Sequence, residues 1–149
     1  MNINYFMKEA IKEANNAFNN NEVPVGGILV DNKTNEIICR THNQVNKEQN
    51  AIYHCEIDLI IHSCKKLSQK YLDDTVMFVT LEPCLMCASA ISKVHIEKLY
   101  FGAYDDKNGG IEKFKYQSNR KHQFKTDIYG GIMENDCKNL LENFFKKLR

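Results

Sequence analysis

Two short segments of the chain hold side chains that can bind a transition metal. The first is His54-Cys55-Glu56, and the second runs from Glu82 to Cys87 and places Cys84 thirty residues after His54. One imidazole and two thiolates supply three ligands to a tetrahedral zinc ion and leave its fourth position open for water, as in catalytic zinc sites. A structural site needs a fourth protein ligand, and none stands nearby at the usual spacing. We therefore predict that His54, Cys84 and Cys87 bind zinc.

The residues beside these ligands suit a hydrolytic reaction. Glu56 stands two residues after His54 and is not needed as a ligand, so its carboxylate can move protons between a zinc-bound water and a substrate. Pro83 suits the first turn of a helix, and a spacing of three places Cys84 and Cys87 on the same side of that turn. The positive end of the helix dipole then favours thiolates over thiols.

The composition is that of a single globular domain over residues 1–149. Apolar residues make up 43% of the chain and charged residues 26%, with a net charge of +1. No apolar run approaches the roughly 18 residues that cross a bilayer, and the N-terminus has no signal-peptide pattern. We expect a cytoplasmic chain with no membrane contact and with reduced cysteines. Of the six cysteines, only Cys84 and Cys87 have the spacing of metal ligands.

The apolar pattern predicts an alternation of helices and strands. Helices are expected near residues 4–20, 54–67 and 84–93, with a final helix capped by Asn135 or Asp136. A glycine pair at positions 26 and 27 suggests a close approach of another segment to the backbone. Strands separated by helices favour parallel pairing. We predict a three-layer α/β/α sandwich around a mixed five-stranded sheet, with strands near residues 23–30, 36–41, 76–80, 99–103 and 124–129.

A basic segment with interleaved aromatic residues extends from Lys113 to Lys125. It has five Lys or Arg residues and no acidic one, and it includes Phe114, Tyr116 and Phe124. Such a segment suits contacts to a nucleic-acid backbone together with base stacking. The alternative is a solvated, irregular segment with no ligand.

The pattern H-x-E with P-C-x-x-C is a signature of the zinc-dependent nucleobase deaminases. Beyond it, the chain resembles the bacterial tRNA-specific adenosine deaminases of the zinc-dependent cytidine/deoxycytidylate deaminase superfamily over nearly its whole length. Cys55 and Tyr104 depart from that family's pattern, which usually has alanine and often has a basic residue at these two positions. The matching stretches are residues 22–26, 42–43, 54–57, 79–88, 101–105 and 143–145.

This resemblance implies a cytidine-deaminase-like fold and hydrolytic deamination of adenosine to inosine at the wobble position of a tRNA anticodon. It implies zinc-bound hydroxide as the attacking group, one Zn²⁺ per subunit held by His54, Cys84 and Cys87, and Glu56 as the proton shuttle. The expected partners are a tRNA anticodon stem-loop and a second copy of the chain, since family members form homodimers. The resemblance also implies substrate contacts by Asn43, Val25 and Asp105.

Other functions remain open at this point. The same chemistry could serve a free base or nucleoside such as guanine or cytosine, and Asp105 could be an ordinary turn residue. A non-catalytic RNA-binding subunit would not need Glu56, and a structural zinc module lacks its fourth ligand. The segment from Lys113 to Lys125, Asp105, and the Phe144-Phe145-Lys146-Lys147 end of the last helix favour RNA.

Overall fold

A five-stranded mixed sheet forms the centre of the protein in a computed structural model that describes residues 1–117 and 125–149. The strand order is β2-β1-β3-β4-β5. The central strand β3 pairs antiparallel with β1 and parallel with β4, and β1 pairs antiparallel with the edge strand β2. The strands are β1 (Gly26–Asp31), β2 (Ile37–His42), β3 (Thr75–Leu81), β4 (Lys98–Ala103) and β5 (Asp127–Tyr129).

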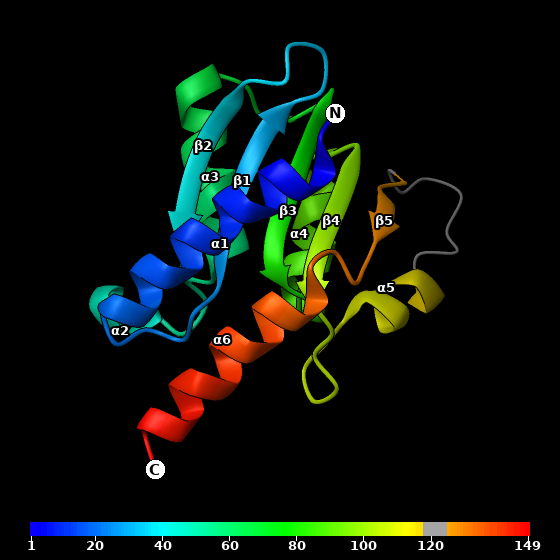
Figure 1. The fold of residues 1–149 in the computed structure, drawn as a ribbon. Coiled ribbons are helices and arrows are strands. Elements are labelled where there is room, and N and C mark those ends of the chain that lie inside the picture. Colours follow the sequence, from blue (N-terminus) through cyan, green and yellow to red (C-terminus); the bar gives the residue numbers. More distant parts are fainter. Residues whose placement is uncertain (118–124) are drawn as a thin grey trace.

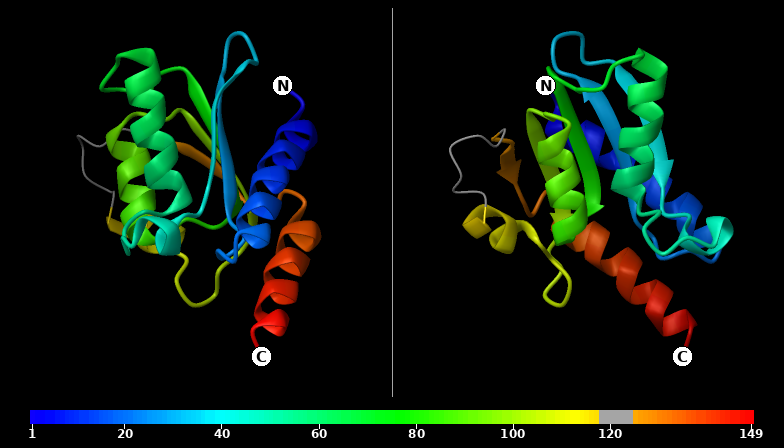
Figure 2. Two further views of the ribbon diagram at one scale, coloured as in Figure 1. Left: turned by 90° about the vertical axis from the view of Figure 1, so that its left-hand side faces the viewer. Right: turned by 180° about the vertical axis from the view of Figure 1, so that it is seen from behind.

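Helices cover both faces of the sheet, which confirms the predicted three layers (Figures 1 and 2). Helices α1 and α6 lie on one face, and α3 and α4 lie on the other (Figure 2). Helix α1 presents Phe6, Met7, Ala10, Ala14 and Ala17 to the sheet, the spacing of one buried helical face. The helices are α1 (Ile3–Asn19), α2 (Val45–Glu48), α3 (Cys55–Leu67), α4 (Leu85–Lys93), α5 (Ile111–Gln117) and α6 (Glu134–Lys147).

The two faces of the sheet form separate hydrophobic clusters. Successive side chains of a strand point to opposite faces, so Phe78 of β3 packs in the cluster under α1, whereas Met77 and Val79 pack in the cluster under α3 and α4. All three side chains are 0% exposed. This explains why the sequence of β3 is apolar without alternation, since neither of its faces meets water.

The chain direction brings the beginnings of two helices to one edge of the sheet. Strand β2 runs parallel to β3 because both pair antiparallel with β1, and helix α3 connects them. Strand β3 runs parallel to β4, and α4 connects those two. Helices α3 and α4 therefore begin at the same end of the sheet, where β2 and β3 end.

Three local features differ from the sequence predictions. The final helix begins at Glu134 after Met133, which adopts a left-handed conformation with φ of 51° and gives no side-chain cap, so the expected cap at Asn135 or Asp136 is wrong. The polar loop after β2 contains the short helix α2, and the first residues of the basic segment belong to α5. Among the described residues, no helix has the length and apolar character needed to cross a membrane.

Gly26 lies where helix α1 crosses the first strand. A Cβ atom at this position would collide with the backbone of α1 at Ala14 N and Ala10 O. The neighbouring Gly27 has more room, because the nearest atoms to a Cβ there would be Cys55 Sγ and Phe78 O, each at 3.1 Å. The predicted close approach at this glycine pair is thus made by α1, and it fixes the distance between helix and sheet.

We expect Gly26→Ala to lower the free energy of unfolding by about 3 kcal/mol or more, because a helix backbone cannot move aside locally. Gly27→Ala is the matched control and should cost about 1 kcal/mol, since its close contacts are less severe. Urea unfolding followed by circular dichroism measures both. Equal losses for the two variants would contradict this account of the packing between α1 and β1.

Candidate metal centre and active-site cleft

The three predicted metal ligands lie at the beginnings of two neighbouring helices. His54 is the residue that precedes α3, Cys84 is the residue that precedes α4, and Cys87 lies in the first turn of α4. Unpaired backbone N–H groups and the helix dipole make such positions electropositive, which favours anionic sulfur ligands. Local structure therefore prepares each side chain, but only the packing of α3 beside α4 brings them together.

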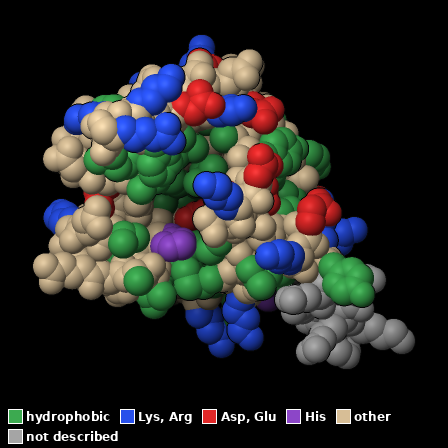
Figure 3. Space-filling model, turned by 90° about the horizontal axis from the view of Figure 1, so that it is seen from below, with side chains coloured by type: hydrophobic (Ala, Val, Ile, Leu, Met, Phe, Trp, Pro, Cys, Tyr) green, Lys and Arg blue, Asp and Glu red, His purple; other side chains and the backbone are tan. Residues whose placement is uncertain are grey.

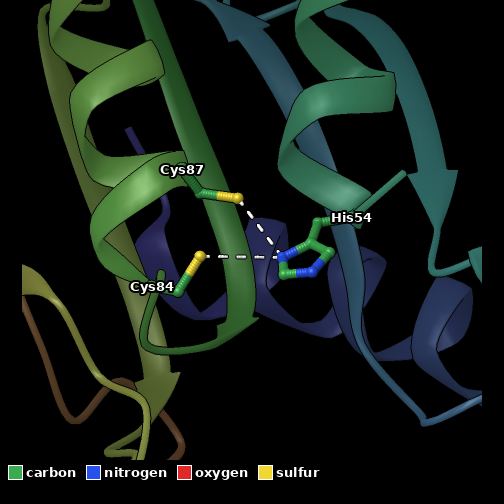
Figure 4. Close-up of side chains that lie close together, drawn as sticks. All are labelled: His54, Cys84 and Cys87. Atoms are coloured by element: carbon green, nitrogen blue, oxygen red, sulfur yellow. Dashed lines mark hydrogen bonds between the residues drawn. The ribbon is translucent and has the colours of Figure 1, made fainter. Parts of the chain in front are cut away.

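The ligand atoms converge closely enough to hold one ion (Figure 4). His54 Nδ1 lies 3.5 Å from Cys87 Sγ and 3.7 Å from Cys84 Sγ, and all three ligand atoms lie within 4.8 Å of one another. With zinc–sulfur bonds of about 2.3 Å and zinc–nitrogen bonds of about 2.0–2.1 Å, tetrahedral geometry separates sulfur from nitrogen by about 3.6 Å. The donor set and its spacing therefore fit zinc.

Hydrogen bonds among these three groups distribute charge unequally between the sulfurs. The Cys87 thiol and the His54 imidazole lower the pKa of Cys84 to about 4. The bond to Cys84 raises the pKa of Cys87 far above its usual value and also raises the pKa of His54. The three side chains thus share protons where they would otherwise hold a divalent cation, and metal binding would release those protons.

Glu56 lies beside the cluster in the first turn of α3 and is 5% exposed. Burial raises the pKa of its carboxyl above the usual value, and the negative charge of Cys84 adds to the effect. Within the described chain, neither Glu56 nor Cys55 joins the group of ligand atoms. Cys55 Sγ instead faces Thr41, whose carbonyl oxygen and hydroxyl both lie 3.5 Å away. Glu56 is therefore placed to exchange protons near the cluster without occupying a ligand position.

A cleft of about 1210 Å³ opens over the cluster and contains six of the seven site residues predicted from sequence. Cys87 alone lies beneath its surface and is 0% exposed. Figure 3, which views this end of the molecule, shows a hollow with hydrophobic side chains inside and Lys and Arg side chains on its rim. The six residues in the cleft are Val25, Asn43, His54, Glu56, Cys84 and Asp105.

Asn43 and Val25 form one wall of the cleft and are linked to each other. The Asn43 backbone N–H donates to Val25 O at 2.9 Å, and the Asn43 side-chain amide lies 3.4 Å from Val23 O. That contact involves only the nitrogen of the carboxamide. Asn43 is thus held in position by its backbone, and its side chain borders the space in which a substrate would lie.

Asp105 follows β4 and lines the opposite part of the cleft. Its Oδ1 accepts hydrogen bonds from the backbone N–H groups of Lys107 and Asn108 at 3.1 and 3.0 Å. This is the turn that the sequence left open as an alternative. A substrate contact by the second carboxylate oxygen stays a prediction.

Two carboxylates that the sequence analysis did not single out hold the loops around the cleft. Glu82 accepts from the backbone N–H groups of Asp105 at 3.3 Å and Ile111 at 3.4 Å. Glu22, 2% exposed, accepts from the Asn46 N–H at 2.7 Å. Each of these carboxylates stands directly before a short apolar segment that contains proline, and this position was the only sign of them in the sequence. Their hydrogen-bond partners could not be predicted, because those residues are distant in sequence.

Comparison with known proteins agrees with this geometry. The family model for the cytidine and deoxycytidylate deaminase zinc-binding region matches residues 1–103. A tRNA-specific adenosine deaminase of Rickettsia bellii is 42% identical over 96% of this chain and 99% of its own length, and one of Bacillus subtilis is 41% identical over 97% and 89%. The chain belongs to the tRNA-specific adenosine deaminases of this zinc-binding family.

A solved structure supports the same membership of the deaminase family. It comes from a study of A-to-I editing by tRNA:A34 deaminases at the wobble position of transfer RNA, and it is 36% identical to this chain. The two superpose with a TM-score of 0.85, covering 92% of this chain and 99% of the other. The agreement therefore extends over almost the whole fold.

The structure changes the interpretation of the segments proposed to contact RNA in this deaminase. Phe114 of α5 and Phe144 of α6 are 9% and 4% exposed, so both belong to the hydrophobic core and cannot stack on bases. Tyr116 and Phe145 are exposed, and Phe145 lines the cleft. Part of the basic segment from Lys113 to Lys125, namely residues 118–124 with Phe124, lies outside the described residues.

We expect the purified protein to contain one zinc per chain and Cys87→Ala to lose most of it, since two remaining ligands cannot hold the ion tightly. Cys64→Ala is the matched control, because Cys64 lies on α3 outside the ligand group and should leave the zinc content unchanged. Elemental analysis per mole of protein measures both. A metal-free wild type that is fully active would contradict the prediction.

Proposed function

We propose that this chain hydrolyses adenosine to inosine at the wobble position of a tRNA anticodon, with one zinc ion per chain. The observation that carries the proposal is the placement of Glu56 beside the His54, Cys84 and Cys87 cluster in a cleft bordered by cations. Near full-length similarity to tRNA-specific adenosine deaminases supports the choice of substrate. The proposed reaction replaces the amino group at C6 by the oxygen of water and releases ammonia.

The residues of the chain have distinct proposed roles. His54, Cys84 and Cys87 would hold zinc, which supplies Lewis acidity that activates a water molecule at neutral pH. Glu56 would take a proton from the attacking water and deliver protons to N1 of the purine and to the leaving amine. A carboxyl whose pKa is raised by burial suits both directions of transfer. Asn43 can donate to or accept from the purine, and Val25 forms an apolar wall.

The size of the cleft and the Lys and Arg residues at its border favour RNA over a free base. Its volume of about 1210 Å³ exceeds the roughly 300–1,000 Å³ of sites that enclose a small molecule. Lys107, Lys138, Lys146 and Arg149 line it together with five carboxylates, and three of these four cations lie on or after α6. A free base has no phosphate for these cations, whereas an anticodon loop presents both phosphates and unstacked bases.

Two further properties follow from the family resemblance and belong to the proposal. We expect a homodimer, which analytical ultracentrifugation at micromolar concentration would measure. We also expect the enzyme to act in the cytoplasm, because the proposed reaction is a step of RNA editing on tRNA.

Glu56→Gln should retain zinc and fold but lose at least about 10²–10⁴-fold in kcat, because general acid–base groups contribute that much and this one would serve several transfers. Inosine release from an anticodon stem-loop measures the effect, with zinc content measured on the same sample. Glu36→Gln, an exposed carboxylate on the turn between β1 and β2, is the control and should match the wild type. Activity of Glu56→Gln within tenfold of wild type would assign the proton shuttle to another residue.

The wild type should turn over an anticodon stem-loop with a kcat/KM that falls steeply as salt rises. Each phosphate neutralised by Lys or Arg adds to the salt dependence, whereas an uncharged base is hardly screened. Kinetics for the stem-loop and for adenosine, cytosine and guanine, each at low and high salt, test this. Efficient, salt-independent turnover of a free base with no reaction on the stem-loop would establish the alternative small-molecule activity.

A further inference from the structure

Tyr104 presents an aromatic side chain at the rim of the cleft. It follows directly after β4, it is 53% exposed, and it lines the same cleft as His54 and Glu56. A tyrosine in this position offers a ligand an apolar ring face while its hydroxyl can stay in water. The catalytic chemistry proposed above makes no use of this ring.

Neighbouring groups fix the orientation of the Tyr104 ring. The buried Phe101 ring lies 5.0 Å away, centroid to centroid, at an interplanar angle of 87°. The backbone at Gly130 and Gly131 lies alongside: a Cβ at Gly130 would come within 2.7 Å of Tyr104 Oη, and one at Gly131 within 3.6 Å of Tyr104 Cε2. The ring is therefore packed on one side and open on another.

The backbone that carries Tyr104 is connected to the metal-ligand segment. The Asp105 N–H donates to Glu82 Oε1 at 3.3 Å, and the Gly110 N–H donates to Pro83 O at 2.9 Å. Glu82 and Pro83 directly precede the ligand Cys84. The position of the Tyr104 ring is thus fixed relative to the ligand cluster, as a recognition group near a reacting atom needs to be.

We propose that Tyr104 is the stacking platform for a nucleobase that flanks the target adenosine, and so a specificity-determining residue for RNA. The inference rests on the proposed function. A target base inserted towards the cluster leaves its neighbours at the rim, where a fixed aromatic ring can stack on one of them. Stacking requires the ring and no charge, which distinguishes Tyr104 from the cations of the same rim.

Tyr104→Ala should lower kcat/KM for the anticodon stem-loop by roughly 5- to 150-fold, corresponding to the usual effect of removing one base–aromatic stack. The loss should appear in KM, because the ring touches a flanking base and not the reacting atoms. Tyr104→Phe keeps the ring and should match the wild type. Tyr5→Ala is the matched control: Tyr5 is 50% exposed on α1, outside the residues that line the cleft.

Salt dependence separates stacking from charge. Tyr104→Ala should leave the slope of log kcat/KM against log salt unchanged, because stacking releases no counterions. Tyr104→Lys should recover activity only at low salt. It should also make the slope of log kcat/KM against log salt more negative by about one, the effect of one added phosphate contact. A Tyr104→Ala variant with a reduced slope would instead indicate that position 104 acts on the phosphate backbone, and would overturn the proposal.

Fluorescence gives a direct signature of the stack. Stem-loops with 2-aminopurine at either nucleotide flanking the target are titrated with Glu56→Gln protein, which binds without turnover. Quenching at one flank that persists with Tyr104→Phe and is lost with Tyr104→Ala supports the proposal. If wild type forms inosine but Tyr104→Ala changes neither kcat/KM nor quenching, this inference is wrong. A wild type inactive on the stem-loop would refute the proposed function itself.

Discussion

The candidate site depends on one geometric constraint. His54 Nδ1 and the two cysteine sulfurs must be separated by the distance between two ligands of a tetrahedral zinc ion. The nitrogen lies at the beginning of α3 and the sulfurs lie at the beginning of α4, at distances of 3.5 and 3.7 Å. A shift of either helix by about an ångström would take these atoms out of ligand geometry. The cluster also concentrates charge, since two thiols and an imidazole share protons in partly buried surroundings. The separation of the beginnings of α3 and α4 therefore decides whether one ion can contact all three atoms.

The central sheet supplies that rigidity. Strand β3 lies between the two hydrophobic clusters, and its Phe78 ring packs against Phe6 at 5.4 Å and Tyr100 at 5.0 Å. On the other face, the side chains of α3 and α4 share one cluster with Met77 and Val79. Because close-packed interiors resist deformation, the beginnings of α3 and α4 stay at a fixed separation.

The proposed substrate contacts lie on different elements, most of them loops. The cleft wall around Asn43 and the rim around Asp105 are fixed by backbone hydrogen bonds to the carboxylates of Glu22 and Glu82. Helix α6 adds cations and Phe145 from the far end of the chain. A rigid centre for the chemistry with recognition groups on surrounding loops is a common division in enzymes, because loops can vary without disturbing the core.

The sequence by itself determined the candidate chemistry and the order of the main elements. Ligand spacing, a proline before the first cysteine and a carboxylate two residues after the histidine predicted the cluster, because these depend on local helix geometry. Apolar periodicity predicted five strands and the main helices within a few residues. The last helix cap was missed because Met133 takes a left-handed conformation that its residue type does not favour.

Only the tertiary structure decided which surface residues belong to the site. Phe114 and Phe144 looked like candidates for base stacking until packing buried them, Phe114 in the cluster under α3 and α4 and Phe144 against Phe18 of α1, whereas Tyr104 and Phe145 were left at the cleft. Glu22 and Glu82 gained their roles from backbone groups 24 and 23 residues away. The physical reason is that burial and long-range hydrogen bonds arise from how elements pack, which residue type and spacing do not encode locally.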